Sequence, residues 1–143
     1  MGDYMQTLDF AIQREEQAYD FYITLAHKAT SNEMRAVLAA FAEEELRHKA
    51  ILSSLKTQAA QAPDMQLRDI SPGDDSTDID PTPDMSYRDA LRLAIQKEAN
   101  AFRFYRDFAA ITKDEDLRNT FLTLAQEEAK HKQRFEEEYE RCA

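Results

Sequence analysis

Cysteine, glycine and proline are scarce in this sequence of 143 residues. The single cysteine, Cys142, lies next to the C-terminus, so the chain has neither a disulfide framework nor a Cys-x-x-Cys pair for zinc, iron or redox exchange. Only two glycines are present, and the four prolines all fall between residues 63 and 83. Turn-forming residues are therefore concentrated in one stretch of the chain.

Long apolar runs and clusters of basic residues are also missing. The longest apolar run, residues 36–42, is far shorter than the ~20 residues that a membrane span requires, and Met1-Gly2-Asp3 opens no signal peptide. We therefore expect a soluble, cytoplasmic protein with no membrane partner. The net charge of −10, without any basic cluster, excludes nucleic acid, whose affinity comes largely from Lys and Arg on phosphates.

Apolar residues make up 43% of the chain, which is enough for a folded core despite the high charge. The length predicts a single domain, 1–143. All the prolines lie in a segment from about residue 62 to about residue 86, which carries seven aspartates against one arginine. This composition is typical of a long acidic crossover rather than of a helix.

The segments on either side of this linker repeat each other at a constant offset of 83 residues. The sequence AIQREEQAYDFY at 11–22 aligns with AIQKEANAFRFY at 94–105, and AEEELRHK at 42–49 aligns with AQEEAKHK at 125–132. We predict two duplicated helical hairpins, about 4–56 and about 86–140, with the crossover between the second and third helices. The fold class is all-α, an antiparallel four-helix bundle.

Apolar residues recur at helical spacing in each of the four predicted helices. The expected core stripes are Leu8, Ile12, Tyr19, Tyr22 and Ala26; Met34, Leu38, Phe41, Leu52 and Leu55; Leu91, Ile95, Phe102, Tyr105 and Ala109; and Leu117, Phe121, Leu124 and Phe135. Thr30-x-x-Glu33 and Thr112-x-x-Glu115 are capping boxes that predict the starts of the second and fourth helices. Ser86-x-x-Asp89 predicts the start of the third.

Polar residues interrupt these stripes at six inward positions, which are Glu15, Glu45, His48, Glu98, Glu128 and His131. Unpaired carboxylates in an apolar core are costly, and four at one level would repel one another. Two divalent cations would balance the four carboxylate charges, and neutral imidazoles would add ligands without charge. In each Glu-x-x-His pair the two side chains share one helix face. The sequence therefore predicts a di-metal site, against the alternative of a plain bundle whose Glu and His lie at the stripe edge.

The remaining acidic residues need no role beyond a solvated face. We expect surface positions for Glu16, Glu43, Glu44, Glu127, Glu136, Glu137, Glu138 and Glu140. Tyr22 and Tyr105 lie two turns after Glu15 and Glu98, so their hydroxyls are candidates to orient ligand carboxylates. His27 has no counterpart in the second half and is assigned to the helix dipole.

The motifs Glu15-x-x-Ala18-x-x-x-Tyr22 and Glu45-x-x-His48, with Glu98-x-x-Ala101-x-x-x-Tyr105 and Glu128-x-x-His131, resemble the rubrerythrin branch of the ferritin-like superfamily. The resemblance covers about residues 4–56 and 86–140. It implies a ferritin-like bundle with a di-iron centre. Carried over by position, Glu45 and Glu128 would bridge the metals, and Glu15 and Glu98 would be terminal ligands.

The sequence departs from this family in two respects. It has no four-cysteine rubredoxin-like module, and it has Ala101 where rubrerythrins place a further glutamate that takes part in a redox-linked ligand switch. The fold and the metal site therefore carry over better than the peroxidase activity.

Together, these features predict a non-haem di-iron oxidoreductase, a peroxidase or ferroxidase, that reduces hydrogen peroxide or O₂ while oxidising Fe(II). Electrons would come from a separate donor protein. Two alternatives stay open: ferroxidation for iron storage or for delivery to a shell-forming partner, and a non-catalytic bundle stabilised by Zn²⁺ or Mn²⁺. We expect a homodimer, in which two chains either do or do not exchange hairpins.

Overall fold

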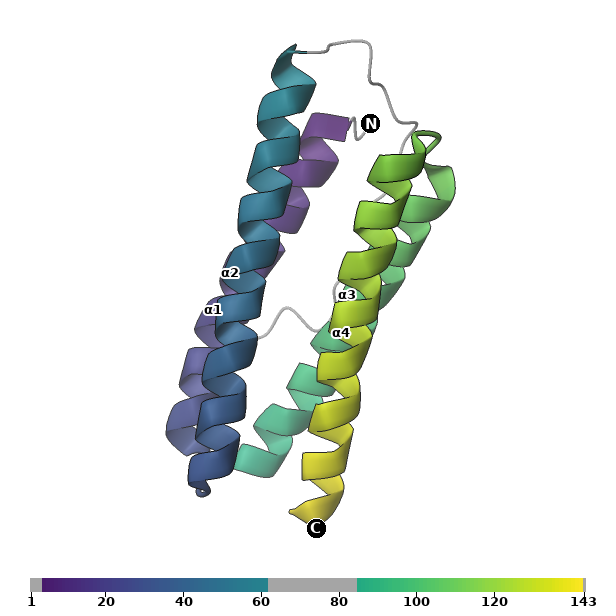
Figure 1. The fold of residues 1–143 in the computed structure, drawn as a ribbon. Helices are drawn as coiled ribbons and strands as arrows, with labels where there is room; N and C mark the ends of the chain where they lie inside the picture. Colours follow the sequence, from purple (N-terminus) through teal and green to yellow (C-terminus); the bar gives the residue numbers. More distant parts are fainter. Residues whose placement is uncertain (1–3, 62–84, 143) are drawn as a thin grey trace. The chain divides into compact units, whose positions relative to one another are not determined.

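The structure of the protein is a computed structural model that describes residues 4–61 and 85–142. These residues form four helices, α1 (Tyr4–Lys28), α2 (Asn32–Gln61), α3 (Tyr87–Ile111) and α4 (Glu115–Arg141), and no strand occurs among them (Figure 1). Most of the predicted acidic crossover, residues 62–84, lies outside the described part. The chain divides into two compact units, one around each hairpin. The expectation of a single domain stays a prediction.

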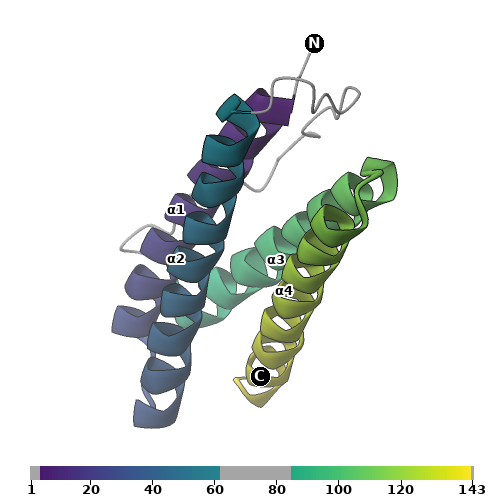
Figure 2. The ribbon, with the colours of Figure 1, turned by 45° about the horizontal axis from the view of Figure 1, so that its top comes forward.

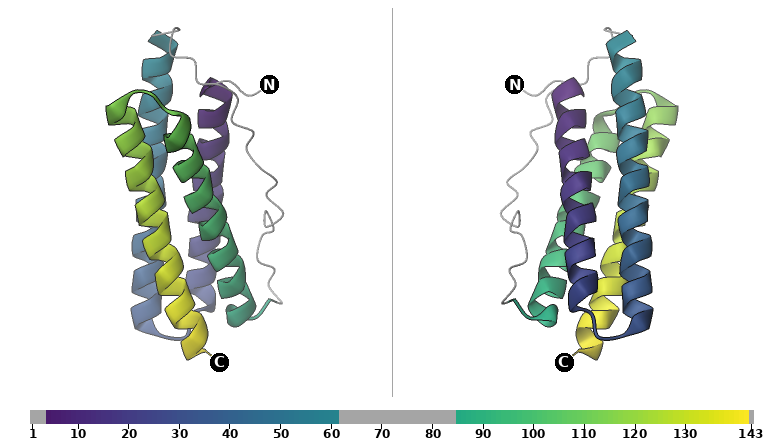
Figure 3. Two further views of the ribbon diagram at one scale, coloured as in Figure 1. Left: turned by 90° about the vertical axis from the view of Figure 1, so that its right-hand side faces the viewer. Right: turned by 90° about the vertical axis from the view of Figure 1, so that its left-hand side faces the viewer.

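In the first unit α1 and α2 run antiparallel, side by side (Figures 1 and 3). Two surface ion pairs show how the residues of α1 and α2 align. Asp9 Oδ1 lies 2.6 Å from Lys56 Nζ, and Glu16 Oε2 lies 3.0 Å from Lys49 Nζ. A step of seven residues forward in α1 thus matches a step of seven back in α2. Helix α1 and helix α2 are joined by only the three residues 29–31, which forces the antiparallel arrangement.

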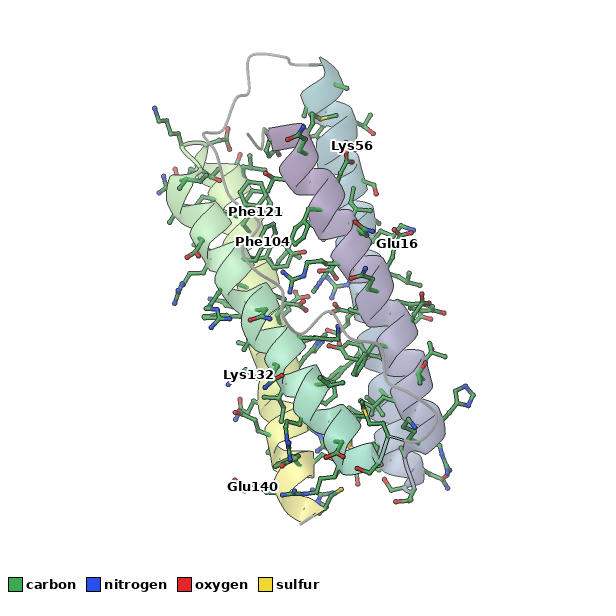
Figure 4. The ribbon with its side chains drawn as sticks, turned by 180° about the vertical axis from the view of Figure 1, so that it is seen from behind. Glu16, Lys56, Phe104, Phe121, Lys132 and Glu140 are labelled. Atoms are coloured by element: carbon green, nitrogen blue, oxygen red, sulfur yellow. The ribbon has the colours of Figure 1, made fainter. Side chains whose placement is uncertain are left out.

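In the second unit α3 and α4 form an equivalent hairpin (Figure 2). Near the turn, the rings of Phe108 and Phe121 stack with centroids 4.0 Å apart, and Phe104 meets Phe108 edge to face at 5.8 Å (Figure 4). At the opposite end, the Tyr87 hydroxyl donates to Glu138 Oε2 at 3.0 Å. Contacts at both ends fix the register of the hairpin along its full length.

Most predicted core residues are buried. The confirmed ones are Leu8, Tyr22, Met34, Leu38, Leu52, Leu91, Tyr105, Ala109, Leu117, Phe121, Leu124 and Phe135. Others predicted for the core are only half-buried, namely Ile12, Tyr19, Ala26, Phe41, Leu55, Ile95 and Phe102. In α1 and α3 the neighbouring Ala11 and Ala94 are buried in place of the isoleucines. The buried stripe of these two helices therefore keeps most of its predicted positions but passes through the alanine and not the adjacent isoleucine.

The structure confirms one of the three predicted N-cap residues, and in the other two helices a nearby residue is the cap. Ser86 caps α3 as predicted, because its side chain accepts a hydrogen bond from the backbone N–H of Asp89 at 3.0 Å. At the start of α2, Ser31 Oγ accepts from the backbone N–H of Met34 at 3.0 Å. The prediction of Thr30 as the cap is therefore wrong, since the adjacent serine satisfies the exposed amide instead.

The start of α4 differs in the same way. Asp114 is the N-cap, and its Oδ1 accepts from the backbone N–H of Leu117 at 2.9 Å. Thr112, predicted as this cap, closes α3 instead, and its hydroxyl donates to the Phe108 carbonyl oxygen at 2.6 Å. A carboxylate is also the better cap electrostatically, because it complements the positive end of the helix dipole.

None of the four helices combines the length and the apolar character needed to cross a membrane, as far as the described residues extend.

The cap of α2 is directly testable. We expect Ser31→Ala to lower the free energy of unfolding by about 1 kcal/mol, because it exposes an unsatisfied helix N–H. Thr30→Ala, at an exposed position that caps nothing, changes this free energy by less than about 0.5 kcal/mol. Urea denaturation followed by circular dichroism measures both, with the m-value as a check on the two-state assumption. Equal losses in the two variants would contradict the assignment of Ser31.

Candidate metal centre

The first hairpin brings together three side chains of types that can bind a metal, which we call the N-terminal triad: Glu15 from α1, and Glu45 and His48 from α2. All three are buried. His48 Nδ1 lies 3.3 Å from Glu15 Oε2 and 3.7 Å from Glu45 Oε1. The i, i+3 spacing of Glu45 and His48 puts both on the face of α2 that meets α1.

The second hairpin repeats this arrangement in the C-terminal triad, which consists of Glu98 from α3, and Glu128 and His131 from α4. These three side chains are also buried. His131 Nδ1 lies 3.7 Å from Glu98 Oε2 and 3.6 Å from Glu128 Oε1. The duplication seen in the sequence is therefore also present in the side-chain geometry.

The spacing of the donor atoms in each triad fits a bound cation. The three residues of a triad each offer one ligand atom, and these atoms lie within 4.8 Å of one another. Two donors bound to one ion at about 2.1 Å, with an angle of roughly 90–110° between them, are about 3.0–3.4 Å apart. The Nδ1–O separations of 3.3–3.7 Å are close to this range. Small side-chain rotations would bring each triad around one ion.

The chemistry of the donors narrows the choice of ion. Each triad offers two carboxylates and one imidazole, and no sulfur. Imidazole nitrogen suits borderline transition metals, whereas carboxylate oxygen also accepts harder ions, so the mixed set fits iron, manganese or zinc better than calcium or magnesium. Burial independently favours a bound cation, because a carboxylate removed from water is stable in its charged form only beside a positive group.

The structure brings the predicted site residues together within each hairpin, and their role as ligands stays a prediction. Tyr22 and Tyr105 are buried, as a position beside the core requires. Their rings meet Phe21 and Phe104 edge to face, with centroids 6.1 and 5.3 Å apart. Their proposed part in orienting carboxylates also stays a prediction.

One buried acid was not predicted from the sequence. Glu138, predicted on the surface, is buried, so that prediction is wrong. It accepts hydrogen bonds from the Tyr87 hydroxyl at 3.0 Å and the Cys142 thiol at 3.9 Å, and Arg141 lies 3.8 Å away. The signal was present in the sequence, because alternating steps of four and three from Leu117 through Glu128 arrive at position 138.

This cluster holds its hydrogen-bond donors in their protonated forms. Burial, reinforced by the hydrogen bond to Glu138, raises the pKa of Tyr87 well above its usual range. Burial and the nearby Glu138 carboxylate likewise raise the pKa of the Cys142 thiol. Both groups therefore remain neutral donors at physiological pH, and neither is set up as a nucleophile.

An all-α chain whose hairpins each bury a carboxylate from one helix and a Glu-x-x-His pair from the other belongs to the ferritin-like class. Within that class, the chain belongs to the rubrerythrin family, whose sequence model matches residues 6–76 and 89–142. Both the predicted fold class and the resemblance to rubrerythrins are confirmed. The buried Glu and His groups are compatible with a di-iron site.

A solved structure supports the same fold. The chain is similar to a hypothetical protein from Pyrococcus furiosus, with 25% sequence identity and a TM-score of 0.77. The similarity covers 95% of this chain and 87% of the other. No curated protein matches the sequence. The neighbour therefore supports the assigned fold.

Removal of two triad carboxylates tests metal binding through stability. A metal ion that binds only the folded state stabilises it by about 2.7 kcal/mol at a hundredfold excess over its dissociation constant. We expect anaerobic Fe²⁺ to raise the free energy of unfolding of the wild type by this order, and to leave Glu45→Ala/Glu128→Ala nearly unchanged.

The matched control is Glu44→Ala/Glu127→Ala, which removes two acids one position earlier in each helix, again 83 residues apart. It should respond to Fe²⁺ as the wild type does. A ligand-pair variant that keeps the full stabilisation, measured by urea denaturation with and without metal, would refute the site.

Proposed function

We propose that this protein is a non-haem di-iron oxidoreductase that reduces hydrogen peroxide or O₂ with electrons from a separate donor protein. The observation that carries the proposal is the presence of two equivalent buried triads in a chain of the rubrerythrin family. The six ligands would be those of the N-terminal and C-terminal triads. A bridging role for Glu45 and Glu128, and a terminal role for Glu15 and Glu98, follow from the family resemblance.

Charge balance supports two ions rather than one. The two triads contain four carboxylates and two imidazoles. Two Fe²⁺ ions would neutralise the four carboxylates, while neutral histidines would complete the coordination. A single ion would leave two buried negative charges without compensation, which is costly in a medium of low dielectric constant. Mn²⁺ or Zn²⁺ would satisfy the same balance as substitutes.

The residues of the chain would perform three tasks. The triads hold their donor atoms at fixed separations, because each Glu-x-x-His pair is rigidly spaced on its helix. Burial of the six side chains limits access of water, so that reactive oxygen species meet few competing groups. Tyr22 and Tyr105 would fix carboxylate orientation through their hydroxyls. When bound, the iron pair supplies one electron from each ion and Lewis-acid chemistry toward oxygen.

The electrons for this reaction would come from outside the chain. Reduction of hydrogen peroxide to water consumes two electrons and two protons, and a chain with one cysteine has no iron–sulfur or dithiol centre of its own to supply them. A separate redox protein would therefore re-reduce the iron. We also propose a homodimer in the cytoplasm.

A second function, iron handling, is favoured by one observation. Position 101 is alanine, and it lies one turn after Glu98 on α3, where rubrerythrins carry the glutamate of their ligand switch. A centre without that switch would oxidise Fe(II) and then either retain the product or deliver it to a storage shell.

Loading with iron and oxidation distinguish these functions. We expect the anaerobic protein to bind two Fe²⁺ per chain and, on addition of peroxide, to develop the near-ultraviolet absorption of a diferric centre. With a reductant present, the oxidoreductase should turn over many equivalents of peroxide, and faster than with O₂. Stopped-flow absorption and iron analysis after desalting provide the measurements.

Other results would overturn the proposal. Retention of more than two irons per chain after repeated oxidation would indicate storage or delivery. Stable binding of Zn²⁺ or Mn²⁺, without oxidation of bound Fe²⁺, would indicate a metal-stabilised bundle. The Glu45→Ala/Glu128→Ala variant should show neither iron binding nor oxidation, whereas Glu44→Ala/Glu127→Ala should match the wild type.

A further inference from the structure

The duplicated helices α1 and α3 carry opposite charges at equivalent exposed positions. Asp9 of α1 corresponds to Arg92 of α3, and Asp20 corresponds to Arg103, at the same offset of 83 that relates the two triads. All four side chains are exposed. The triad residues are the same in the two hairpins, whereas these exposed positions are acidic on α1 and basic on α3.

The face on α3, which we call the arginine face, consists of Arg88, Arg92, Arg103 and Arg106. At 100° per residue these four positions fall within an arc of about 60°. Side-chain exposure of 58% for Arg92 and 55% for Arg106 leaves the face open to solvent. Arg92 lies 3.9 Å from Asp89 and Arg106 lies 3.7 Å from Asp107, both at the long end of the ion-pair range. The face therefore retains positive charge.

Aromatic and amide groups hold these arginines in place. Arg92 donates to the Tyr139 hydroxyl at 3.2 Å, and the Arg88 guanidinium lies 3.9 Å from the centroid of the same ring. Arg106 lies 5.5 Å from the centroid of half-buried Phe102, and Arg103 donates to the Asn100 side chain. Ordered guanidinium groups over aromatic rings lose little conformational freedom on docking, and arginine is enriched at protein interfaces.

The face on α1, which we call the acidic face, consists of Asp9, Glu16 and Asp20. The Asp9 and Glu16 side chains are 53% and 51% exposed, and each pairs with a lysine of α2: Asp9 with Lys56 and Glu16 with Lys49. These ion pairs are solvated, so a guanidinium can share either carboxylate. The carboxylates of Asp9 and Asp20 are separated by eleven residues, the same interval as Arg92 and Arg103.

We propose that the arginine face of one copy docks on the acidic face of a second copy. Because both pairs of charges are about 16 Å apart along their helices, one alignment satisfies both ends together. Each copy carries both faces, so this contact is available in either direction between two copies. The half-buried Ile12 and Phe102 on these helices supply apolar area beside the charges.

Substitutions that reverse the charge of one face at a time test this surface. The acidic variant Arg92→Asp/Arg103→Asp has two acidic faces, and the basic variant Asp9→Arg/Asp20→Arg has two basic ones. We expect each alone to dimerise with a dissociation constant at least about tenfold above that of the wild type, because attraction becomes repulsion. An equimolar mixture should recover wild-type affinity, since each face then meets its opposite.

Sedimentation velocity of the full chain over a range of concentrations provides the measurement, in low and high salt because screening weakens the contact. The control Arg35→Asp/Arg47→Asp makes the same change in net charge on α2, and it should dimerise as the wild type does. Recovery of the mixed dimer also shows that both variants are folded.

Three results would overturn the proposal: a wild type that is monomeric at all concentrations, an acidic variant that dimerises as tightly as the control, or a mixture that does not recover. An acidic donor protein as the true occupant of the arginine face would give the first or second result. None of these readouts depends on iron, so they leave the proposed reaction untouched.

Discussion

The burial of carboxylates among apolar residues is the constraint on which the rest of this structure depends. Glu45 and Glu128 lie at helix positions where an aliphatic side chain would pack, and their charge is acceptable only with a positive partner. Each histidine lies 3.3–3.7 Å from two such carboxylates, so each hairpin gathers nitrogen and oxygen donors at one place. The helices are thus built around polar groups that a plain hydrophobic core would exclude.

The predictable parts of the fold follow from periodicity and duplication. Apolar spacing predicted the four helices and the two hairpins. Its interruption at regular positions, repeated at one offset, predicted the triad residues that each hairpin brings together. The repeat was decisive, because a single Glu-x-x-His arises easily by chance on a charged helix. Two aligned copies with two further glutamates do not.

The helix caps and core positions that were predicted wrongly have identifiable physical causes. At the starts of α2 and α4, two residues able to cap a helix lie within one or two positions of each other, and hydrogen-bond geometry selects Ser31 and Asp114. In α1 and α3, a stripe drawn through the isoleucines gave way to one through Ala11 and Ala94. A helix turns slightly less per residue than a heptad pattern assumes, so neighbouring seams compete, and small side chains let helices approach more closely. Sequence spacing alone does not resolve either choice.

The completeness of each triad within one hairpin bears on the ancestry of the chain. A single hairpin holds one complete triad, so two identical hairpins would carry the same six residues as separate molecules. Identical subunits must carry the same outer charge, however, because one gene encodes both. Joining the two copies in one polypeptide removes that symmetry: selection can preserve the inner face of both halves while Asp9 and Arg92 diverge. Fusion therefore gives the protein a directional surface that no symmetric pair of hairpins could have.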